Sequence, residues 1–174
     1  MIFETERLYV TKWKNTDLKA LHEIYNDAGI KEFILPKLTI KETRCIFENQ
    51  LDHYSGHFPF GRYFIMEKVS NKFIGLLLFK KDNKKGCVEI GYSLIKNQWN
   101  KGYATEIVKE SITWIFEQDR FLSISAITEL HNENSKNVLL KCGFQPEENF
   151  TENGKEMNLF GLLKKENTEI EYFT

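Results

Sequence analysis

Residues 87–130 read CVEIGYSLIKNQWNKGYATEIVKESITWIFEQDRFLSISAITEL. Short β-like runs stand at the two ends of this stretch, at 87–95 and 123–130. Between them, apolar residues recur at the spacing of one helix face, at Ala104, Ile107, Val108, Ile112, Ile115 and Phe116. Two sheet strands joined through a helix need a crossover connection, which makes them parallel and the crossover right-handed. This stretch therefore predicts a mixed sheet that contains a strand–helix–strand unit.

The chain before residue 87 predicts further strands and two helices. Residues 7–14 alternate apolar and polar side chains, the period of a half-buried strand. The first helix follows the capping residues Asn-Thr-Asp at 15–17, and the second spans 39–54 with a candidate Thr/Glu capping box at its start. Strand-like runs at 62–69 and 72–80 come next, and together with 87–95 they predict an antiparallel meander.

After residue 130 the sequence predicts one helix and two strands. The helix covers residues 132–141 and ends at Gly143, a candidate left-handed cap. The strands flank Asn153-Gly154, a strong hairpin turn, and the polar tail 166–174 is expected to fray. The predicted order is β-α-α-β-β-β-α-β-α-β-β. It indicates an α/β (α+β) fold with a mixed, mostly antiparallel sheet of about seven strands and helices on both faces.

Length and charge limit the number of domains and the classes of function that the chain can have. The 174 residues show no linker, so we expect a single domain over 1–174 with its core at about 4–163. With 24 basic and 25 acidic residues and no basic stripe, a nucleic-acid partner is not expected. No apolar run reaches the ~18 residues of a membrane span, and no secretory signal is visible. Three separated cysteines fit a reducing compartment, so the expected location is cytoplasmic.

The turn at residues 97–105, NQWNKGYAT, leads from the meander into the clearest predicted helix. The first N–H groups of a helix have no intrahelical partner and attract anions such as phosphate. Gly102 allows close approach of the backbone, Lys101 adds positive charge and the Thr105 hydroxyl adds a donor. An ordinary strand-to-helix connection has the same appearance, so these residues alone leave phosphate binding open. The Walker and G-x-G-x-x-G nucleotide motifs are absent.

Four short motifs occur in a fixed order along the chain. They are Thr5-Glu6-Arg7-Leu8, Glu89-Ile90-Gly91-Tyr92, Asn100-Lys101-Gly102-Tyr103-Ala104-Thr105-Glu106, and Asn132-Glu133-Asn134-Ser135 with the following Val138–Phe144. Together they resemble the GCN5-related N-acetyltransferase (GNAT) superfamily, and within it the RimJ/RimL-like branch of ribosomal-protein N-terminal acetyltransferases. Each motif is weak alone, but four in register with the expected elements make a specific match over roughly residues 4–163.

The resemblance implies an acetyl-coenzyme A site without a metal. In the family the loop Q/R-x-x-G-x-G/A wraps the pyrophosphate; here Trp99 stands for the usual Gln or Arg, and Asn100 stands where Gly is frequent. The pantetheine arm is implied to lie between the parallel strands. The cofactor-binding residues implied in this way are Leu94, Ile95, Trp99, Asn100, Lys101, Gly102, Tyr103, Ala104, Thr105 and Asn132.

Acetyl transfer from a thioester to an amine needs a base for the amine and an acid for the thiolate. Glu89 is the candidate base because it stands in an otherwise apolar strand shortly before the loop; a solvent-facing or structural glutamate is the alternative. A backbone N–H near Leu94 would hold the oxyanion. The branch resemblance implies Ser135 as the proton donor, although Ser135 equally fits a helix cap. His131 is a minor alternative base.

Other chemistry-bearing residues fit packing at least as well. Cys87 and Cys142 lie among apolar neighbours in the sequence, which favours packing over a nucleophilic role. His53 and His57 have a zinc-like spacing but lack a third ligand. Aromatic residues in or next to the predicted loop before residue 62 are candidates for an acceptor pocket or for the core: Phe58, Phe60 and Tyr63.

The expected function is direct transfer of an acetyl group from acetyl-CoA to a primary amine, of a protein N-terminus or a small molecule, by a monomer or homodimer. A non-catalytic acyl-CoA-binding or sensing domain on the same fold is the alternative, and a nucleotide-phosphate enzyme is a third reading. The predicted loops at 29–38 and 52–62 carry no charge pattern that selects among N-terminal peptides, polyamines, antibiotics and small amines.

Overall fold

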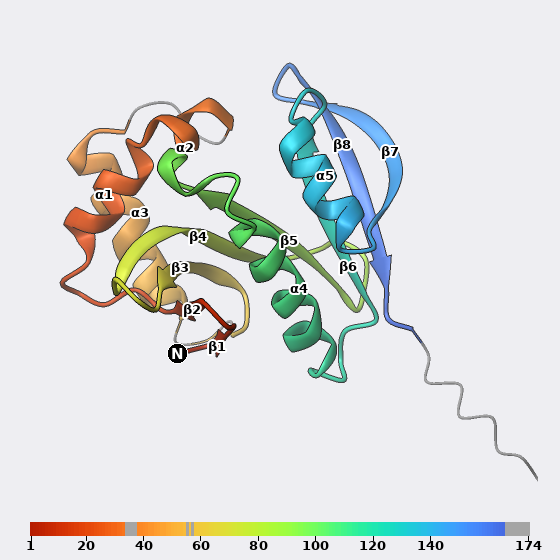
Figure 1. Cartoon of the computed structure of the whole chain (residues 1–174), viewed down its shortest axis with the longest axis horizontal. Coiled ribbons are helices and arrows are strands. Elements are labelled where there is room, and N and C mark those ends of the chain that lie inside the picture. The colour runs from red at the N-terminus through yellow and green to blue at the C-terminus, as the bar shows by residue number, and fades with distance from the viewer. Residues whose placement is uncertain (34–37, 55, 57, 166–174) are drawn as a thin grey trace, which may run out of the picture.

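The computed structural model describes residues 1–33, 38–54, 56 and 58–165. Its sheet has eight strands in the order β1-β2-β3-β4-β5-β6-β8-β7 (Figure 1). The elements are β1 (Phe3–Glu4), β2 (Leu8–Thr11), α1 (Leu18–Tyr25), α2 (Ala28–Phe33), α3 (Ile40–His53), β3 (Gly61–Glu67), β4 (Lys72–Lys81), β5 (Cys87–Leu94), the 3-10 helix η1 (Lys96–Gln98), α4 (Tyr103–Phe116), β6 (Ser123–Glu129), α5 (Glu133–Lys141), β7 (Gln145–Glu152) and β8 (Lys155–Leu163).

The sheet is mixed in the way that the crossover predicted. Strands β5 and β6 pair in parallel through α4, and every other neighbouring pair of the described sheet is antiparallel. The parallel ladder joins only residues 87–90 to residues 123–126. Beyond Ile90 and Ala126 the two strands diverge, so an open wedge forms between their carboxyl ends (Figure 1).

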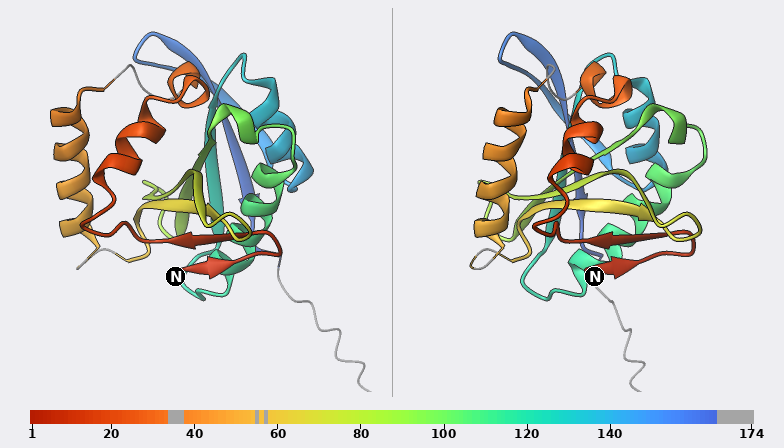
Figure 2. Two further views of the ribbon diagram at one scale, coloured as in Figure 1. Left: turned by 60° about the vertical axis from the view of Figure 1, so that its left-hand side comes forward. Right: turned by 90° about the vertical axis from the view of Figure 1, so that its left-hand side faces the viewer.

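Helices cover both faces of the sheet, as predicted (Figure 2). Helices α4 and α5 pack on one face over a core that includes Leu77, Val88 and Ile107. Helices α1, α2 and α3 pack on the other face around Phe64 and Leu76. Because successive side chains of a strand point to opposite faces, the neighbours Leu76 and Leu77 serve the two separate cores.

One strand and one α-helix were not predicted, and neither was the short 3-10 helix η1. The two-residue strand β1 pairs with β2, so the sheet has eight strands rather than about seven. Helix α2 begins at Ala28, where Gly29 had marked the end of the preceding helix. The Asp27 carboxylate accepts hydrogen bonds from the amides of Gly29 and Lys96, at 2.8 and 2.9 Å, and so joins the start of α2 to η1.

The helix ends agree with the sequence in part. At α3 the predicted capping box is confirmed, since the Thr39 hydroxyl accepts from the Glu42 amide while the Glu42 carboxylate accepts from the Thr39 amide. At α1 the expected side-chain cap is wrong. Asp17 is the N-cap residue, but its carboxylate accepts from the Lys14 amide, 2.8 Å away, upstream of the helix.

The capping box gives a stability prediction. Thr39→Ala removes the hydroxyl that accepts from the Glu42 amide, and should lower the free energy of unfolding by about 1 kcal/mol. Urea denaturation followed by circular dichroism measures the change. Thr16→Ala is the control, because the exposed Thr16 hydroxyl bonds only the Asp17 side chain among the described contacts. Equal stability of the Thr39 variant and the parent would contradict the assigned cap.

The last two strands form the predicted hairpin, with Asn153 at φ 51 and Gly154 at φ 77 in its turn. Helix α5 also ends as predicted, with Gly143 at φ 91 just beyond it. The tail 166–174 and part of the predicted loop at 29–38 lie outside the described residues. Among the described helices, none is long and apolar enough to cross a membrane.

Candidate functional site

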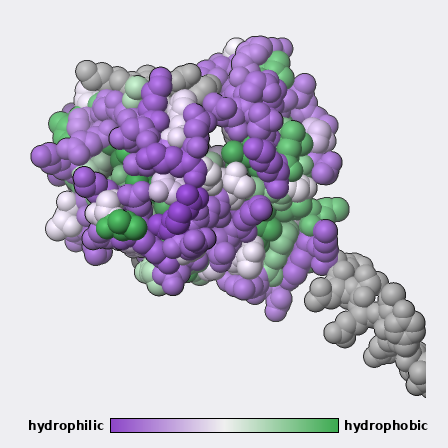
Figure 3. Space-filling view, viewed as in Figure 1, coloured by the Kyte–Doolittle hydropathy of each residue, from purple (hydrophilic) through white to green (hydrophobic). Residues whose placement is uncertain are grey.

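A cavity of about 500 Å³ lies in the wedge where β5 and β6 diverge. Figure 3 shows the surface hollowed between the α2 and α5 sides of the molecule. Strand β5, the turn before α4, strand β6, helix α5 and the start of β8 supply its walls. The lining residues are Gly29, Tyr92, Ser93, Leu94, Gln98, Trp99, Asn100, Gly102, Tyr103, Ala104, Thr105, Ile127, Thr128, Glu129, Asn132, Asn134, Ser135, Asn137, Val138, Lys141 and Met157.

The turn before α4 forms part of the cavity wall. Gly102 is the N-cap residue of α4, at φ 79 and ψ −1, and Asn100 also has a left-handed backbone at φ 60. Asparagine adopts this conformation more readily than other non-glycine residues, so Asn100 keeps a backbone shape that a glycine would favour. Glycine has no side chain with which to cap a helix. The first N–H groups of α4 therefore remain available to an anion at the cavity wall.

Trp99 fastens this turn to the neighbouring strand. Its indole Nε1–H donates to the Leu94 carbonyl over 2.8 Å, and the ring packs so closely on α2 that a Cβ on Gly29 would lie 2.7 Å from it. Leu94 and Trp99 both line the cavity. Ile95 does not line it, because its amide donates to the Ile74 carbonyl on β4. Since peptide groups alternate in direction along a strand, those of Leu94 and Tyr92 face the wedge.

The side chains of two other residues predicted to bind the cofactor are bonded within the protein. Lys101 lies beside the cavity rather than in its wall, and its ammonium donates to Gln98 Oε1 over 2.7 Å. Tyr103 contributes to the wall, but its hydroxyl donates to Glu67 Oε1 over 2.7 Å. Ala104 and Thr105 also line the cavity.

The opposite wall is the start of α5. Asn132 caps this helix, since its side-chain oxygen accepts from the Ser135 amide over 3.0 Å. The Tyr92 hydroxyl lies 3.1 Å from the Ser135 hydroxyl and 3.3 Å from the Ser135 carbonyl, to which it can donate. Burial raises the pKa of Tyr92 strongly, with a smaller opposing effect from Ser135, so Tyr92 stays protonated. Ser135 therefore faces the cavity with a phenol fixed beside it.

Glu89 stands at the closed end of the wedge but outside the cavity wall. It pairs with Ser125 on β6 at the next-to-last rung of the parallel ladder, and shares a strand face with Gly91 and Ser93. Its carboxylate accepts from the Lys80 ammonium over 2.9 Å, and its side chain is 17% exposed. A second carboxylate, Glu129, does line the cavity and is ion-paired with Lys155.

The sequence missed several lining residues because their signal is weak. Tyr92 belongs to a recognised motif, yet its role depends on α5 lying across from β5. Glu129 and Met157 are neighbours only through the register of β6 and β8, which no local pattern specifies. Gly29 looked like a helix terminator rather than the contact surface for Trp99.

The weaker candidates among the described residues do not line the cavity. Burial raises the pKa of both Cys87 and Cys142, so neither thiol is poised as a nucleophile. His131 is exposed and does not line the cavity, and His57 lies outside the described residues. Within the described part of the chain, no group of three or more His, Cys, Asp and Glu side chains could hold a metal ion.

The three predicted acceptor-pocket aromatics do not line the cavity either. Tyr63 is fully buried in the core, and Phe60 packs against Phe121. Phe58 is largely exposed, and packs against Trp114 and beneath the Lys12 ammonium. The core interpretation holds for Tyr63. Phe60 is half-buried and lines a second cavity of about 580 Å³ that Lys80 also borders, so its place in an acceptor pocket stays a prediction.

Comparison with known proteins identifies the family. Residues 7–145 match the family described as Acetyltransferase (GNAT) domain, which is more than half of the chain. The chain belongs to the GNAT family. The uncharacterized N-acetyltransferase p20 of Bacillus licheniformis is 29% identical over 171 residues, covering 93% of this chain and 96% of that protein.

Solved GNAT structures share the fold. A GNAT-family acetyltransferase from Bacillus anthracis has a TM-score of 0.79 at 22% identity, over 92% of this chain and 96% of that one. RimL, a ribosomal-protein alpha-N-acetyltransferase solved in complex with coenzyme A, has a TM-score of 0.78 at 19% identity, over 93% and 97%. The GNAT family uses acetyl-CoA, and the unmatched N–H groups at the glycine N-cap of α4 fit the pyrophosphate of that ligand.

Proposed function

We propose that this GNAT protein transfers the acetyl group of acetyl-CoA directly to a primary amine in a ternary complex. One observation carries the proposal: a left-handed turn at Asn100 and Gly102 opens helix α4 at the mouth of the wedge between β5 and β6. A pyrophosphate at this helix end leaves the wedge free for the thioester arm. The acceptor is an amine of a protein N-terminus or a small molecule. We also propose RimJ/RimL-like branch membership and a cytoplasmic location.

Binding in this proposal depends mainly on backbone groups. The amides from Gly102 to Thr105 receive the pyrophosphate, and the helix dipole of α4 adds to their attraction. The peptide groups of Tyr92 and Leu94 face the wedge, where they bond the pantetheine arm and hold the developing oxyanion. The near-neutral charge of the chain is compatible with an anionic ligand held in this way.

The proton steps use side chains at the two ends of the wedge. Glu89 takes the proton of the acceptor ammonium, directly or through a water molecule, so that the amine becomes nucleophilic. Its place where the strands begin to separate supports this role. Glu129 is the competing carboxylate, because it lies in the cavity wall itself. The Ser135 hydroxyl, fixed by Tyr92, gives its proton to the departing thiolate.

Thiol release from acetyl-CoA in the presence of an amine panel tests the function. The panel contains N-terminal peptides, polyamines, aminoglycosides and small amines, and mass spectrometry identifies the acetylated product. We expect one thiol released per acetylated amine, and a roughly 10²-fold or larger loss of turnover in Ser135→Ala, in the range of one catalytic proton transfer. Coenzyme A binding without turnover on any amine would instead support a sensing domain. Tight ATP binding without coenzyme A binding would support a nucleotide enzyme.

A further inference from the structure

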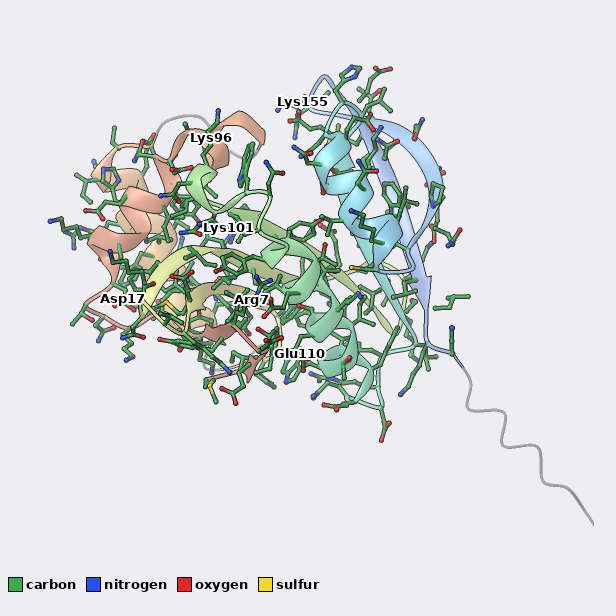
Figure 4. All side chains as sticks on the ribbon, viewed as in Figure 1. Arg7, Asp17, Lys96, Lys101, Glu110 and Lys155 are labelled. Atoms are coloured by element: carbon green, nitrogen blue, oxygen red, sulfur yellow. The ribbon has the colours of Figure 1, made fainter. Side chains whose placement is uncertain are left out.

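Arg7 connects the N-terminal strands to the proposed pyrophosphate loop. It lies in the turn between β1 and β2, and Figure 4 shows it beside α4. Its Nη1 donates to the Lys101 carbonyl over 3.0 Å, and its Nε donates to Glu106 Oε2 over 2.7 Å. Its Nη2 lies 2.6 Å from the same carboxylate oxygen. One guanidinium thus bridges the loop and the first turns of the helix that follows it.

The carboxylate of Glu106 is itself firmly held. Its Oε1 accepts from the Thr5 hydroxyl over 2.5 Å and from the Arg7 amide over 2.9 Å. Burial alone would raise the pKa of Glu106, but these hydrogen bonds and the Arg7 charge lower it below its usual value. Arg7 is therefore paired with a charged carboxylate, which is itself held by the Thr5 hydroxyl and the Arg7 amide.

The ring of Tyr103 supports the guanidinium from a second direction. Arg7 Cζ lies 4.5 Å from the centroid of this ring, a cation–π distance, while the Tyr103 hydroxyl is bonded to Glu67. Arg7 Nη2 would lie 3.5 Å from a Cβ placed on Gly102. Arg7 thus packs against the loop from the side of the N-terminal strands, whereas Gly102 also borders the cavity.

The direction of one peptide group follows from these contacts. In a trans peptide the C=O and N–H of the same unit point in opposite directions. Since Arg7 holds the Lys101 carbonyl, the Gly102 N–H points away from Arg7. Gly102, at φ 79 and ψ −1, has the backbone angles of the third residue of a type II turn. The Lys101–Gly102 peptide is the central peptide of that turn, and in a type I turn it would point in the opposite direction.

We propose that Arg7 is a positioning residue for the pyrophosphate loop. By holding the Lys101 carbonyl it keeps the Gly102 N–H directed at the ligand, and by pairing with Glu106 it offsets a negative charge close to the anion site. Arg7 does not touch the ligand in this role. The inference rests on the proposed function, since it assigns the pyrophosphate of coenzyme A to this loop.

The test compares Arg7→Ala and Arg7→Lys with Lys68→Ala. Lys68 is the matched control because its ammonium donates to the Thr5 carbonyl, 2.5 Å away, and pairs with Glu4. It therefore holds the same N-terminal segment without contacting the loop. Calorimetry measures the Kd for coenzyme A. Thermal unfolding identifies a temperature at which every variant is folded, and kcat/KM is measured with acetyl-CoA and with acetyl-pantetheine, which lacks the pyrophosphate.

We expect Arg7→Ala to raise the Kd for coenzyme A about tenfold, the effect of one charge-assisted hydrogen bond. Its kcat/KM should fall with acetyl-CoA and stay unchanged with acetyl-pantetheine. Arg7→Lys keeps the positive charge but loses the planar guanidinium, which bonds the Lys101 carbonyl and Glu106 at the same time, so it should recover only part of the affinity. Lys68→Ala should bind as the parent does.

Three results would overturn the positioning role: parental coenzyme A affinity in Arg7→Ala, full recovery in Arg7→Lys, or equal losses with the two acetyl donors. A parent protein that binds no coenzyme A would overturn the proposed function instead. The calorimetric titration of the parent separates these two failures before any variant is compared.

Discussion

A Gly102→Val variant is expected to lose coenzyme A affinity by tenfold or more. Gly102 has φ 79, where a β-branched side chain costs about 1–3 kcal/mol in strain. Its Cβ would lie 3.5 Å from Arg7 Nη2, so the added methyl groups press on the guanidinium that holds the turn. Relief of this strain needs a negative φ at residue 102, which turns the Lys101–Gly102 peptide and removes an N–H from the anion site. Calorimetric titration with coenzyme A measures the loss.

Gly154→Val is the matched control for this prediction. Gly154 has φ 77, so valine meets nearly the same backbone strain there. Its position is the β7–β8 hairpin turn, and no heavy atom lies within 4 Å of the added Cβ among the described residues. Both variants should therefore be less stable, but only Gly102→Val should bind coenzyme A more weakly. Equal binding losses in the two variants would show that general destabilisation, rather than the loop, controls affinity.

The elements that the sequence predicted are those whose signals are local. Helix α4 has a continuous apolar face, and the hairpin turn at Asn153-Gly154 needs only two residues to be recognised. The parallel pairing of β5 and β6 followed from the connection between them rather than from composition. Strand β1 was missed because two residues carry no periodicity. Helix α2 was missed because no local pattern indicated its contacts with distant residues, the bond from the Lys96 amide to Asp27 and the packing of Trp99 on Gly29.

In the candidate site too, the sequence indicated the residues that are contiguous and missed those that only the fold brings together. The proposed pyrophosphate loop is contiguous in sequence, so one motif covers most of the cavity wall from Trp99 to Thr105. The sequence named Glu89 as the candidate base and did not single out Glu129, which reaches the cavity wall through the register of β6 and β8. Sequence alone favoured Glu89 for its apolar strand context, and it could not indicate that Lys80 lies directly across from it on β4. The Arg7 bridge spans about a hundred residues and had no signal beyond its motif.

Glu89→Gln is expected to lower kcat/KM for the acceptor amine by about 10²-fold or more at pH 7, the loss typical of a removed general base. The substitution keeps the shape of the side chain and removes its charge. The Lys80 ammonium left behind is more than half exposed, so the free energy of unfolding should change by less than about 1 kcal/mol. The lost activity would then reflect chemistry rather than folding.

The pH profile identifies a missing base. An α-amine has a pKa of roughly 7.7–8.0, so it becomes neutral without help as the pH rises above that range. The deficit of Glu89→Gln relative to the parent should therefore shrink with rising pH. A deficit that is constant with pH would mean that Glu89 shapes the site without taking a proton.

Two further glutamine substitutions complete the assignment of the base. Glu147→Gln removes another ion-paired carboxylate, bonded to Lys84 over 3.2 Å and absent from the cavity wall, and should leave the kinetics unchanged. Glu129→Gln alters the wall itself and should weaken acceptor binding, so that KM rises while the pH profile keeps the parental form. If Glu129→Gln shows the large, pH-dependent loss and Glu89→Gln does not, Glu129 is the base. In that case the amine reacts at the mouth of the wedge, beside Lys155, rather than at the end where β5 and β6 first separate.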